Sequence, residues 1–283
     1  MKNISGKIVK SITNRTADSH KGHYGRAFCV VGSYGMAGAA ILSGLSCLRC
    51  GVGICDIGLP NTIYPIVATN IPEAVYSVYT DDKDCYKALY NGINKATAVL
   101  VGCGRGNTNE TKNIVRYLLE NVECPLIIDA DGINVLKYHI DILEARNAPT
   151  VITPHVGEMS RLTGFSTEHI KQHKVEVATE FAAKYNVIVV LKDFETIVVS
   201  PSGEIYVNHT GNPGMATGGS GDMLAGMVTS FIAQGYNVYE SAIASVHLHG
   251  MTGDMAKEEL TEAAMLPSDM IKMLPKVFTT FIE

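Results

Sequence analysis

Short apolar segments alternate with longer segments of helical periodicity along most of the chain. Continuous apolar runs bounded by glycine or polar residues predict buried strands, and they occur at 26–32, 54–59, 98–101, 126–128, 150–153 and 187–191. Apolar residues at three- and four-residue intervals predict helices, and this spacing covers 112–120, 167–184, 222–234 and 238–259, with a small-residue helix at 38–48. The alternation favours a mainly parallel sheet with helices on both faces.

One pair of predicted strands departs from this alternation. Segments 196–200 and 204–208 flank Pro201-Ser202-Gly203, which is typical of an antiparallel hairpin at one edge of the sheet. The chain shows no repeat, low-complexity tract or composition shift that would mark a linker. We therefore predict an α/β, three-layer fold with a mixed sheet, in a single domain over residues 1–283.

Composition and charge narrow the range of partners. The formal net charge is −5 and there is no long run of lysine or arginine, so we expect no nucleic-acid partner. The first residues lack the apolar stretch of a signal peptide, and no apolar run approaches the roughly 20 residues that span a bilayer. We expect a cytoplasmic protein with no membrane partner, whose seven scattered cysteines are reduced thiols.

The strongest local signal is the glycine-rich segment from Gly211 to Asp222, directly before a predicted helix. Gly219, Ser220 and Gly221 would present unpaired backbone N–H groups and the positive end of the helix dipole, which together favour an anion. Asp222 could accept a proton from a substrate hydroxyl. The alternative is a flexible linker with an ordinary first-turn acid. A position between a hairpin and an apolar helix favours a shaped binding loop.

Further polar residues follow the predicted strands, at the edge where open α/β sheets bind ligands. Asp129, Asp131 and Asn134 follow one strand and place two carboxylates and an amide at this edge. One carboxylate could hold Mg²⁺, directly or through water, or Asp131 merely caps the next helix. His155 and Glu158 follow another strand, although an isolated histidine is more often structural. Lys192 could reach a nucleotide phosphate or be a plain surface lysine.

Glycine clusters after two other strands carry less information. Gly102-Cys103-Gly104-Arg105-Gly106 could approach a ligand through its backbone. The glycines of 32–38 are spaced three apart and do not match the dinucleotide fingerprint, which disfavours a hydride-transfer enzyme.

Two patterns that suggest metal sites are weak. Cys47 and Cys50 have CxxC spacing, but they lie in a predicted helix without a second pair. His247 and His249 are two residues apart on a helix, so their rings point to different faces.

Taken together, these segments resemble the ADP/ATP-dependent NAD(P)H-hydrate dehydratase family, which has the ribokinase-like fold. The resemblance runs from Lys21-Gly22-His23-Tyr24-Gly25 through 129–131, 153–158 and 212–226 to Pro267-Ser268-Asp269, and so covers nearly the whole chain. It implies an enzyme, a lyase, that removes water from the S form of hydrated NADH or NADPH while splitting ADP or ATP. Phosphorylation of the ring hydroxyl followed by loss of phosphate would account for a kinase-like site.

The resemblance also implies roles for individual residues. The hydrated dinucleotide would contact Ala39, Gly104, His155 and Asp222. The adenine nucleotide, ADP or ATP, would contact Gly221 and the segment Lys192, Asp193, Phe194, Glu195 and Thr196. Asp222 would be the general base, and Gly219, Ser220 and Gly221 would bind the transferred phosphoryl group. Asp131 and Glu158 are the candidate Mg²⁺ ligands.

Three positions depart from the family pattern. Cys103 and Arg105 replace the residues of a Gly-Pro-Gly-Leu-Gly cluster, which changes the rigidity and charge of that loop. Asp193 replaces the glycine that normally follows Lys192, and its carboxylate would repel phosphate unless it points away or meets Mg²⁺.

Other functions remain open at this point. A ribokinase-like kinase for a small alcohol or vitamin precursor would share the glycine-rich loop and Asp222, and a nucleotide-binding sensor would keep the pocket without turnover. The resemblance further implies a homo-oligomer, a tetramer, and a separate NAD(P)H-hydrate epimerase as functional partner. The sequence does not decide between ADP and ATP.

Overall fold

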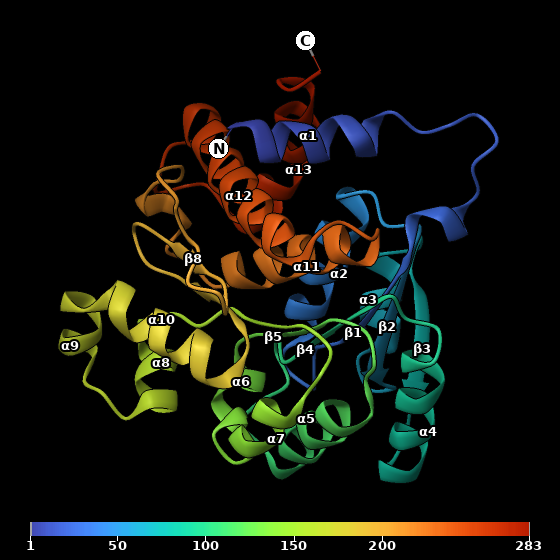
Figure 1. The fold of residues 1–283 in the computed structure, drawn as a ribbon. Coiled ribbons are helices and arrows are strands. Elements are labelled where there is room, and N and C mark those ends of the chain that lie inside the picture. Colours follow the sequence, from blue (N-terminus) through green and yellow to red (C-terminus); the bar gives the residue numbers. More distant parts are fainter. Residues whose placement is uncertain (1, 283) are drawn as a thin grey trace.

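The apolar segments form the strands of one nine-stranded sheet in the computed structural model, which describes residues 2–282 (Figure 1). The strand order is β3-β2-β1-β4-β5-β6-β7-β8-β9. The strands are β1 (Arg26–Val30), β2 (Ile54–Pro60), β3 (Val75–Tyr79), β4 (Ala98–Val101), β5 (Leu126–Ile128), β6 (Thr150–Ile152), β7 (Ile188–Leu191), β8 (Ile197–Val199) and β9 (Ile205–Val207).

The pairing confirms the predicted mixed sheet. Six neighbouring pairs of strands are parallel: β3-β2, β2-β1, β1-β4, β4-β5, β5-β6 and β6-β7. Strands β8 and β9 form the predicted hairpin and join antiparallel to β7. Strand β3 was not predicted, because an edge strand with exposed Val75 and Val78 lacks a continuous apolar run.

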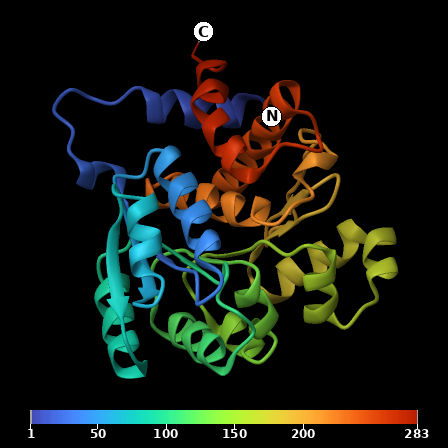
Figure 2. The same ribbon diagram turned by 180° about the vertical axis from the view of Figure 1, so that it is seen from behind.

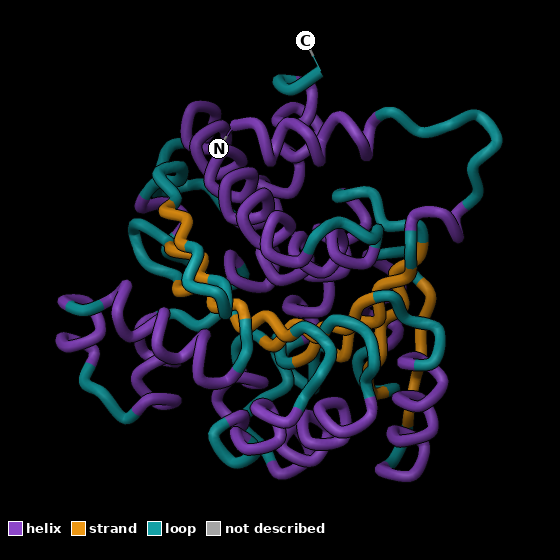
Figure 3. Tube along the Cα trace, viewed as in Figure 1, coloured by secondary structure: helices purple, strands orange, loops and turns teal. Residues whose placement is uncertain are grey.

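Helices cover both faces of this sheet, as predicted (Figure 3). They are α1 (Lys2–Thr13), α2 (Ala37–Arg49), α3 (Tyr64–Asn70), α4 (Asp82–Ile93), α5 (Asn109–Asn121), α6 (Asp131–Leu136), α7 (Ile140–Ala145), α8 (Val156–Thr163), α9 (Thr167–Gln172), α10 (Lys174–Tyr185), α11 (Ser220–Ala233), α12 (Val238–Leu260) and α13 (Pro267–Thr279), with short 3₁₀ turns at Lys21–Tyr24 and Pro213–Met215.

The period-two alternation of the strands separates two cores. On β1, Phe28 and Val30 face a core built with α4 to α10, whereas Ala27 and Cys29 face a core built with α2, α3, α11 and α12. A third apolar cluster joins α1 and α13 to α11 and α12 outside the second core. Figure 2 shows α1 and α13 together on that outer side.

The prediction of a single helix over 167–184 is wrong. The structure has two helices there, α9 and α10, because the backbone of His173 leaves the helical region with φ −119° and ψ 33°. Among residues 2–282, no helix combines the length and the apolar character that crossing a membrane requires.

Candidate active site

Four adjacent strands end beside one buried carboxylate, that of Asp129. Asp129 follows β5 directly and is 1% exposed. Its Oδ1 accepts hydrogen bonds from Lys192 Nζ at 2.8 Å and from Thr153 Oγ1 at 2.5 Å. Its Oδ2 accepts one from Cys103 Sγ at 3.4 Å. The residues after β4, β5, β6 and β7 therefore meet at the carboxyl edge of the sheet, the edge that binds ligands in open α/β folds.

Lys192 is a charged group of this cluster and not the plain surface lysine that is the usual default. Burial lowers its pKa, but the carboxylates of Asp129 and Glu158 more than offset this, so the pKa of Lys192 is raised overall. Its side chain is 20% exposed. An added Cβ at Gly221 would lie 3.2 Å from Lys192 Nζ, so the first turn of α11 faces this ammonium group.

The glycine-rich segment ends at α11 in the way the sequence predicts. Gly219 precedes the helix with φ 96°, a left-handed conformation that suits glycine. The Ser220 side chain is buried, and its Oγ lies 3.4 Å from His249 Nε2, so Ser220 faces the interior with its hydroxyl. Burial lowers the pKa of His249 to about 4, which keeps this supporting imidazole neutral. The segment is therefore an anchored loop and not a flexible linker.

Asp222 lies in the first turn of α11 with its carboxyl group toward the same cluster. Burial and the neighbouring Asp129 carboxylate raise the pKa of Asp222 to about 6, while the Cys103 hydrogen bond and Lys192 oppose the shift. A carboxylate with a pKa near 6 is a better proton acceptor at neutral pH than an ordinary aspartate. This property suits the general base that the sequence suggests.

The two small residues predicted to contact the dinucleotide lie side by side. Gly104 has φ 62°, and an added Cβ there would come within 2.5 Å of Ala39 Cβ. Ser33 Oγ donates to the Gly104 carbonyl at 2.8 Å, and Asp131 Oδ2 accepts the Gly106 N–H at 2.7 Å. Asp131 thus fixes the glycine loop after β4.

Arg105 does not add charge to the site. It is 3% exposed and its guanidinium donates to Glu110 Oε1 at 2.6 Å, to the Gly32 carbonyl at 3.1 Å and to the Tyr79 hydroxyl. Arg105 therefore links the loop after β4, to which it belongs, to the loop after β1. Cys103 is the other residue of this loop that departs from the family pattern, and its side chain faces the Asp129 carboxylate.

His155 and Glu158 form a reciprocal cap at the start of α8. His155 Nδ1 accepts the N–H groups of Gly157 at 3.0 Å and Glu158 at 3.3 Å, and Glu158 Oε2 accepts the His155 N–H at 2.8 Å. Burial and Lys192 lower the pKa of His155, and burial raises the pKa of Glu158 to about 7. His155 is thus a neutral imidazole, half-exposed at the same sheet edge.

The segment from Lys192 to Thr196 is held by a residue that the sequence did not suggest, Lys174 on α10. Lys174 Nζ donates to the Glu195 carbonyl at 2.6 Å, lies 3.5 Å from Asp193 Oδ2 and stands 5.3 Å from the centre of the Phe194 ring. Asp193 therefore pairs with Lys174, which removes the predicted conflict with phosphate. Phe194 is 85% exposed.

Several contributors were missed in sequence. The sequence placed the Asp129 carboxylate at this edge but not at the centre of the cluster, and Thr153 could have been found because it follows a buried strand at the same edge as Asp131 and His155. Lys174 and His249 carry no local signal, since their contacts are made across the fold. Asp131 and Glu158 each bond a backbone amide, and neither belongs to the three-residue donor group Cys103, Asp129 and Asp222.

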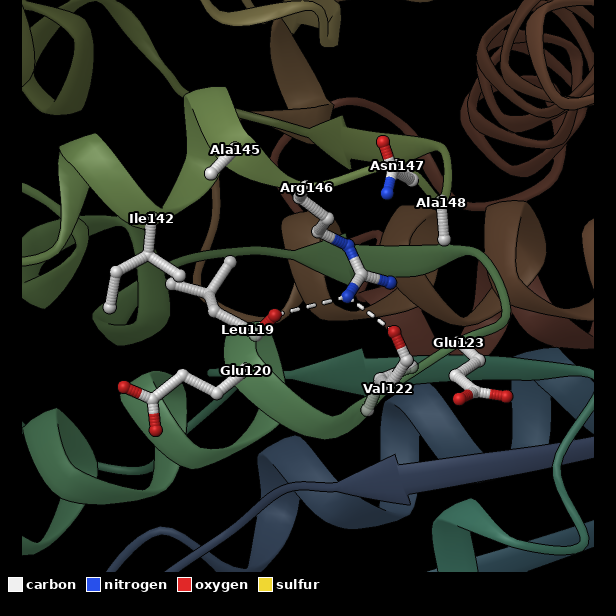
Figure 4. A pocket seen from close by; sticks show the side chains of 9 residues that line it. All are labelled: Leu119, Glu120, Val122, Glu123, Ile142, Ala145, Arg146, Asn147 and Ala148. Carbon is white, nitrogen blue, oxygen red and sulfur yellow. Dashed lines mark hydrogen bonds between the residues drawn. The ribbon is translucent and has the colours of Figure 1, made fainter.

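A separate pocket lies near the amino-terminal ends of β5 and β6, opposite to the ends where the Asp129 cluster lies (Figure 4). It is centred on buried Arg146, whose Nη1 donates to the carbonyls of Leu119 at 3.3 Å and Val122 at 2.5 Å. Arg146 Nη2 donates to the Cys124 carbonyl at 2.7 Å. These contacts tie the end of α5 to the start of β6, so Arg146 has a structural role there.

Comparison with known proteins decides the family. The model of the NAD(P)H-hydrate dehydratase family matches residues 27–276. The chain belongs to this family. A bifunctional NAD(P)H-hydrate repair enzyme of Thermofilum pendens is 37% identical over 275 residues, which are 95% of this chain and 52% of the relative. The chain thus spans about half the length of the first curated relatives it matches.

Two further relatives agree with the family and its fold. The ADP-dependent (S)-NAD(P)H-hydrate dehydratase of Bacillus subtilis is 32% identical over 97% of this chain and 96% of its own length. The crystal structure of an ADP/ATP-dependent NAD(P)H-hydrate dehydratase from Bacillus subtilis, co-crystallized with ATP/Mg²⁺, is 29% identical with a TM-score of 0.82, covering 96% of this chain and 97% of that one. A ribokinase-like superfamily protein of Enterococcus faecalis has a TM-score of 0.86 at 29% identity, covering 98% of this chain and 94% of that one. The predicted ribokinase-like fold is confirmed.

Proposed function

We propose that this chain uses ADP or ATP to dehydrate the S form of hydrated NADH or NADPH and so restores the reduced cofactor. One observation supports it most: the partly buried Asp222 carboxyl, with its pKa raised to about 6, in the first turn of α11 beside the Lys192–Asp129 pair. A proton acceptor, a helix N-terminus and an ammonium group are what phosphoryl transfer from a nucleotide to a hydroxyl requires. Membership of the dehydratase family supplies the substrate class.

The two ligands would lie on either side of α11. We assign Ala39, Gly104, His155 and Asp222 to the hydrated dinucleotide, which the contact of Gly104 with Ala39 supports. The nucleotide would approach Gly221 and the segment from Lys192 to Thr196, where Lys192 faces Gly221. Because its Nδ1 accepts two backbone N–H groups, the neutral His155 can donate a hydrogen bond from Nε2 toward a dinucleotide without adding charge.

The proposed reaction has two steps. In the first step, the oxygen of the ring hydroxyl attacks the terminal phosphorus of ADP while Asp222 accepts the hydroxyl proton. The products of this step are AMP and a phosphorylated hydrate. The Gly219, Ser220 and Gly221 turn and Lys192 stabilise the charge that develops on the phosphoryl oxygens. Loss of phosphate from the carbon that carried the hydroxyl, with loss of a proton from the adjacent ring carbon, then restores the dihydronicotinamide double bond. The overall change is hydrate plus ADP to reduced cofactor, AMP and phosphate.

Mg²⁺ suits this site because the available donors are carboxylate oxygens. Asp131 and Glu158 already bond backbone amides with one oxygen each, so we propose that they hold the ion through water. When bound, Mg²⁺ would neutralise charge on the nucleotide phosphates.

Product analysis tests the proposal. Purified protein is incubated with hydrated NADH, Mg²⁺ and either ADP or ATP, and the reduced-nicotinamide absorbance is followed. Return of the absorbance only with nucleotide supports a dehydratase. Nucleotide binding without return contradicts it, and formation of a stable phosphate ester from a small alcohol would instead identify a kinase.

Other properties of the protein are proposals of the same kind. The family resemblance and the bifunctional Thermofilum repair enzyme support a functional pairing, and we propose that this chain works with an NAD(P)H-hydrate epimerase. We also propose a homotetramer in the cytoplasm, as the family resemblance implies. Size-exclusion chromatography with light scattering tests the tetramer.

The pH dependence of catalysis follows from the pKa of Asp222. A general base works only when it is deprotonated, so kcat/KM should reach a plateau above pH about 6 and fall about tenfold per unit below it. An unperturbed aspartate, whose pKa is about 4, would place this fall nearly two units lower. The measurement is kcat/KM from pH 5 to 8 with a stability check at each pH. The fall should persist in Glu158→Gln, since Glu158 has its own raised pKa; its disappearance there would assign it to Glu158.

Lys174 should position the nucleotide segment without touching the reacting groups. Lys174→Met removes its hydrogen bond to the Glu195 carbonyl and its pairing with Asp193, so we expect KM for ADP to rise about tenfold with kcat little changed. Lys174→Arg should recover most of the loss. Lys184→Met on the same helix α10, where Lys184 is exposed, is the matched control. An unchanged KM in Lys174→Met would remove this role.

A further inference from the structure

Three side chains from separate parts of the chain bring metal-binding atoms together in the site. Cys103 follows β4, Asp129 follows β5 and Asp222 lies in the first turn of α11. One ligand atom from each, a sulfur and two carboxylate oxygens, lies within 4.8 Å of the other two. Within residues 2–282 only one other such group occurs, Cys29, Cys47 and Cys55.

The spacing suits a small tetrahedral ion. Zinc binds thiolate sulfur at about 2.3 Å and carboxylate oxygen at about 2.0–2.2 Å, so two such donors on one ion lie roughly 3.5 Å apart. Cys103 Sγ and Asp129 Oδ2 are 3.4 Å apart. Three protein donors would leave the fourth position open toward the space above Asp222, which is the least buried of the three side chains.

Charge and donor type favour zinc over magnesium. Asp129 and Asp222 supply two carboxylates, and Lys192 bonds Asp129 Oδ1 and leaves Oδ2 on the Cys103 side. Binding of Zn²⁺ with loss of the thiol proton would make the charges of Zn²⁺, the thiolate, the two carboxylates and the ammonium sum to zero. Thiolate sulfur suits zinc, whereas Mg²⁺ prefers oxygen alone.

We propose that Cys103, Asp129 and Asp222 bind Zn²⁺, and that the bound ion inhibits the enzyme by occupying the Asp222 carboxylate. Each binding event releases the thiol proton of Cys103 and forms one Zn–S and two Zn–O bonds. Binding itself does not depend on the proposed function; only the inhibition rests on it. Cys103 is one of the two residues, with Arg105, at which this chain departs from the glycine-cluster pattern.

Cobalt spectroscopy tests the binding, with Co²⁺ alone as the probe. A thiolate bound to Co²⁺ gives a ligand-to-metal absorption band, and added Zn²⁺ should abolish it by displacement. We expect the band in the wild type and in Cys47→Ala, and its loss in Cys103→Ser. Cys47→Ala is the control because Cys47 belongs to the other thiol group, which is fully buried between β1, β2 and α2.

Two results would overturn the proposal: no band in the wild type, or a band that persists in Cys103→Ser. Loss of the band in Cys47→Ala alone would assign it to the buried thiols and also refute the proposal. Circular dichroism confirms that each variant is folded, and Cys103→Ala serves if Cys103→Ser is not.

An inhibition assay tests the consequence. Micromolar Zn²⁺ should inhibit the wild type in competition with the hydrated dinucleotide, and its inhibition constant should rise about tenfold or more in Cys103→Ser. Each variant is compared with its own uninhibited rate. Equal inhibition of both proteins contradicts the proposal. If the protein has no dehydratase activity, the proposed function fails while the cobalt result still decides the metal site.

Discussion

Asp222→Asn is expected to lower kcat by about 10³-fold, because the amide cannot accept the proton of the ring hydroxyl and a positioned base contributes about 10²–10⁴. Nucleotide binding should change little, since the backbone of Gly219 to Gly221 and Lys192 remain. The measurement is kcat with saturating ADP, together with the dissociation constant of ADP from calorimetry. A variant with near-normal kcat would remove Asp222 from the role of base.

The same substitution should not weaken the fold, which separates a catalytic loss from unfolding. The pKa of Asp222 is higher in the folded protein than the ordinary value of 3.8, so the folded state prefers the protonated form. A carboxyl of this kind costs stability at any pH above its folded pKa, here about 6. At pH 7.5 asparagine removes that cost, and we expect an equal or higher melting temperature. A clearly lower one would indicate that Asp222 holds the fold.

The second large effect is expected on stability, for Asp129→Ala. This change leaves Lys192 without its carboxylate and removes the acceptor of Thr153 and Cys103. Loss of one partner of a buried ion pair costs about 3–5 kcal/mol, and we expect about 3 kcal/mol because the Lys192 side chain is 20% exposed. Urea denaturation measures the change in the free energy of unfolding, as a lower midpoint with an unchanged slope.

A surface pair supplies the control for Asp129→Ala. Glu259 and Lys276 pair across α12 and α13 with both side chains about half exposed, so Glu259→Ala should cost less than about 1 kcal/mol. The double variant Asp129→Ala/Lys192→Met should be more stable than the sum of the two single changes predicts, since it leaves no unpaired charge. An Asp129→Ala cost as small as that of Glu259→Ala would contradict the description of Asp129 as the centre of the site.

The fold was predictable where burial alone decides the sequence pattern. Strands such as β4 and β7 are buried on both faces, so a continuous apolar run identifies them. Strand β3 is an edge strand with exposed side chains, and its pattern is correspondingly weak. The break at His173 was also missed, because apolar spacing continues from α9 into α10 while the backbone does not.

The site was predictable as far as local position determines it. Asp131, His155 and Lys192 were suggested because each follows a strand, and parallel strands end at one edge. Side-chain direction was not predictable: Arg105 turns inward to Glu110, whereas Cys103, two residues earlier, faces Asp129. The sequence predicted that the Asp193 carboxylate would repel a nucleotide phosphate. Lys174, 19 positions earlier, pairs with Asp193, and this contact exists only in the folded chain.

An oxygen-labelling experiment tests the central claim most directly. Hydrated NADH prepared in ¹⁸O-water carries the label on the ring hydroxyl, and the enzyme is supplied with ADP, Mg²⁺ and unlabelled water. If the hydroxyl is phosphorylated and then lost, the released phosphate should carry one ¹⁸O atom for every NADH restored, as measured by the isotope shift in ³¹P NMR. Unlabelled phosphate with the label in bulk water, or no return of NADH, would contradict the account.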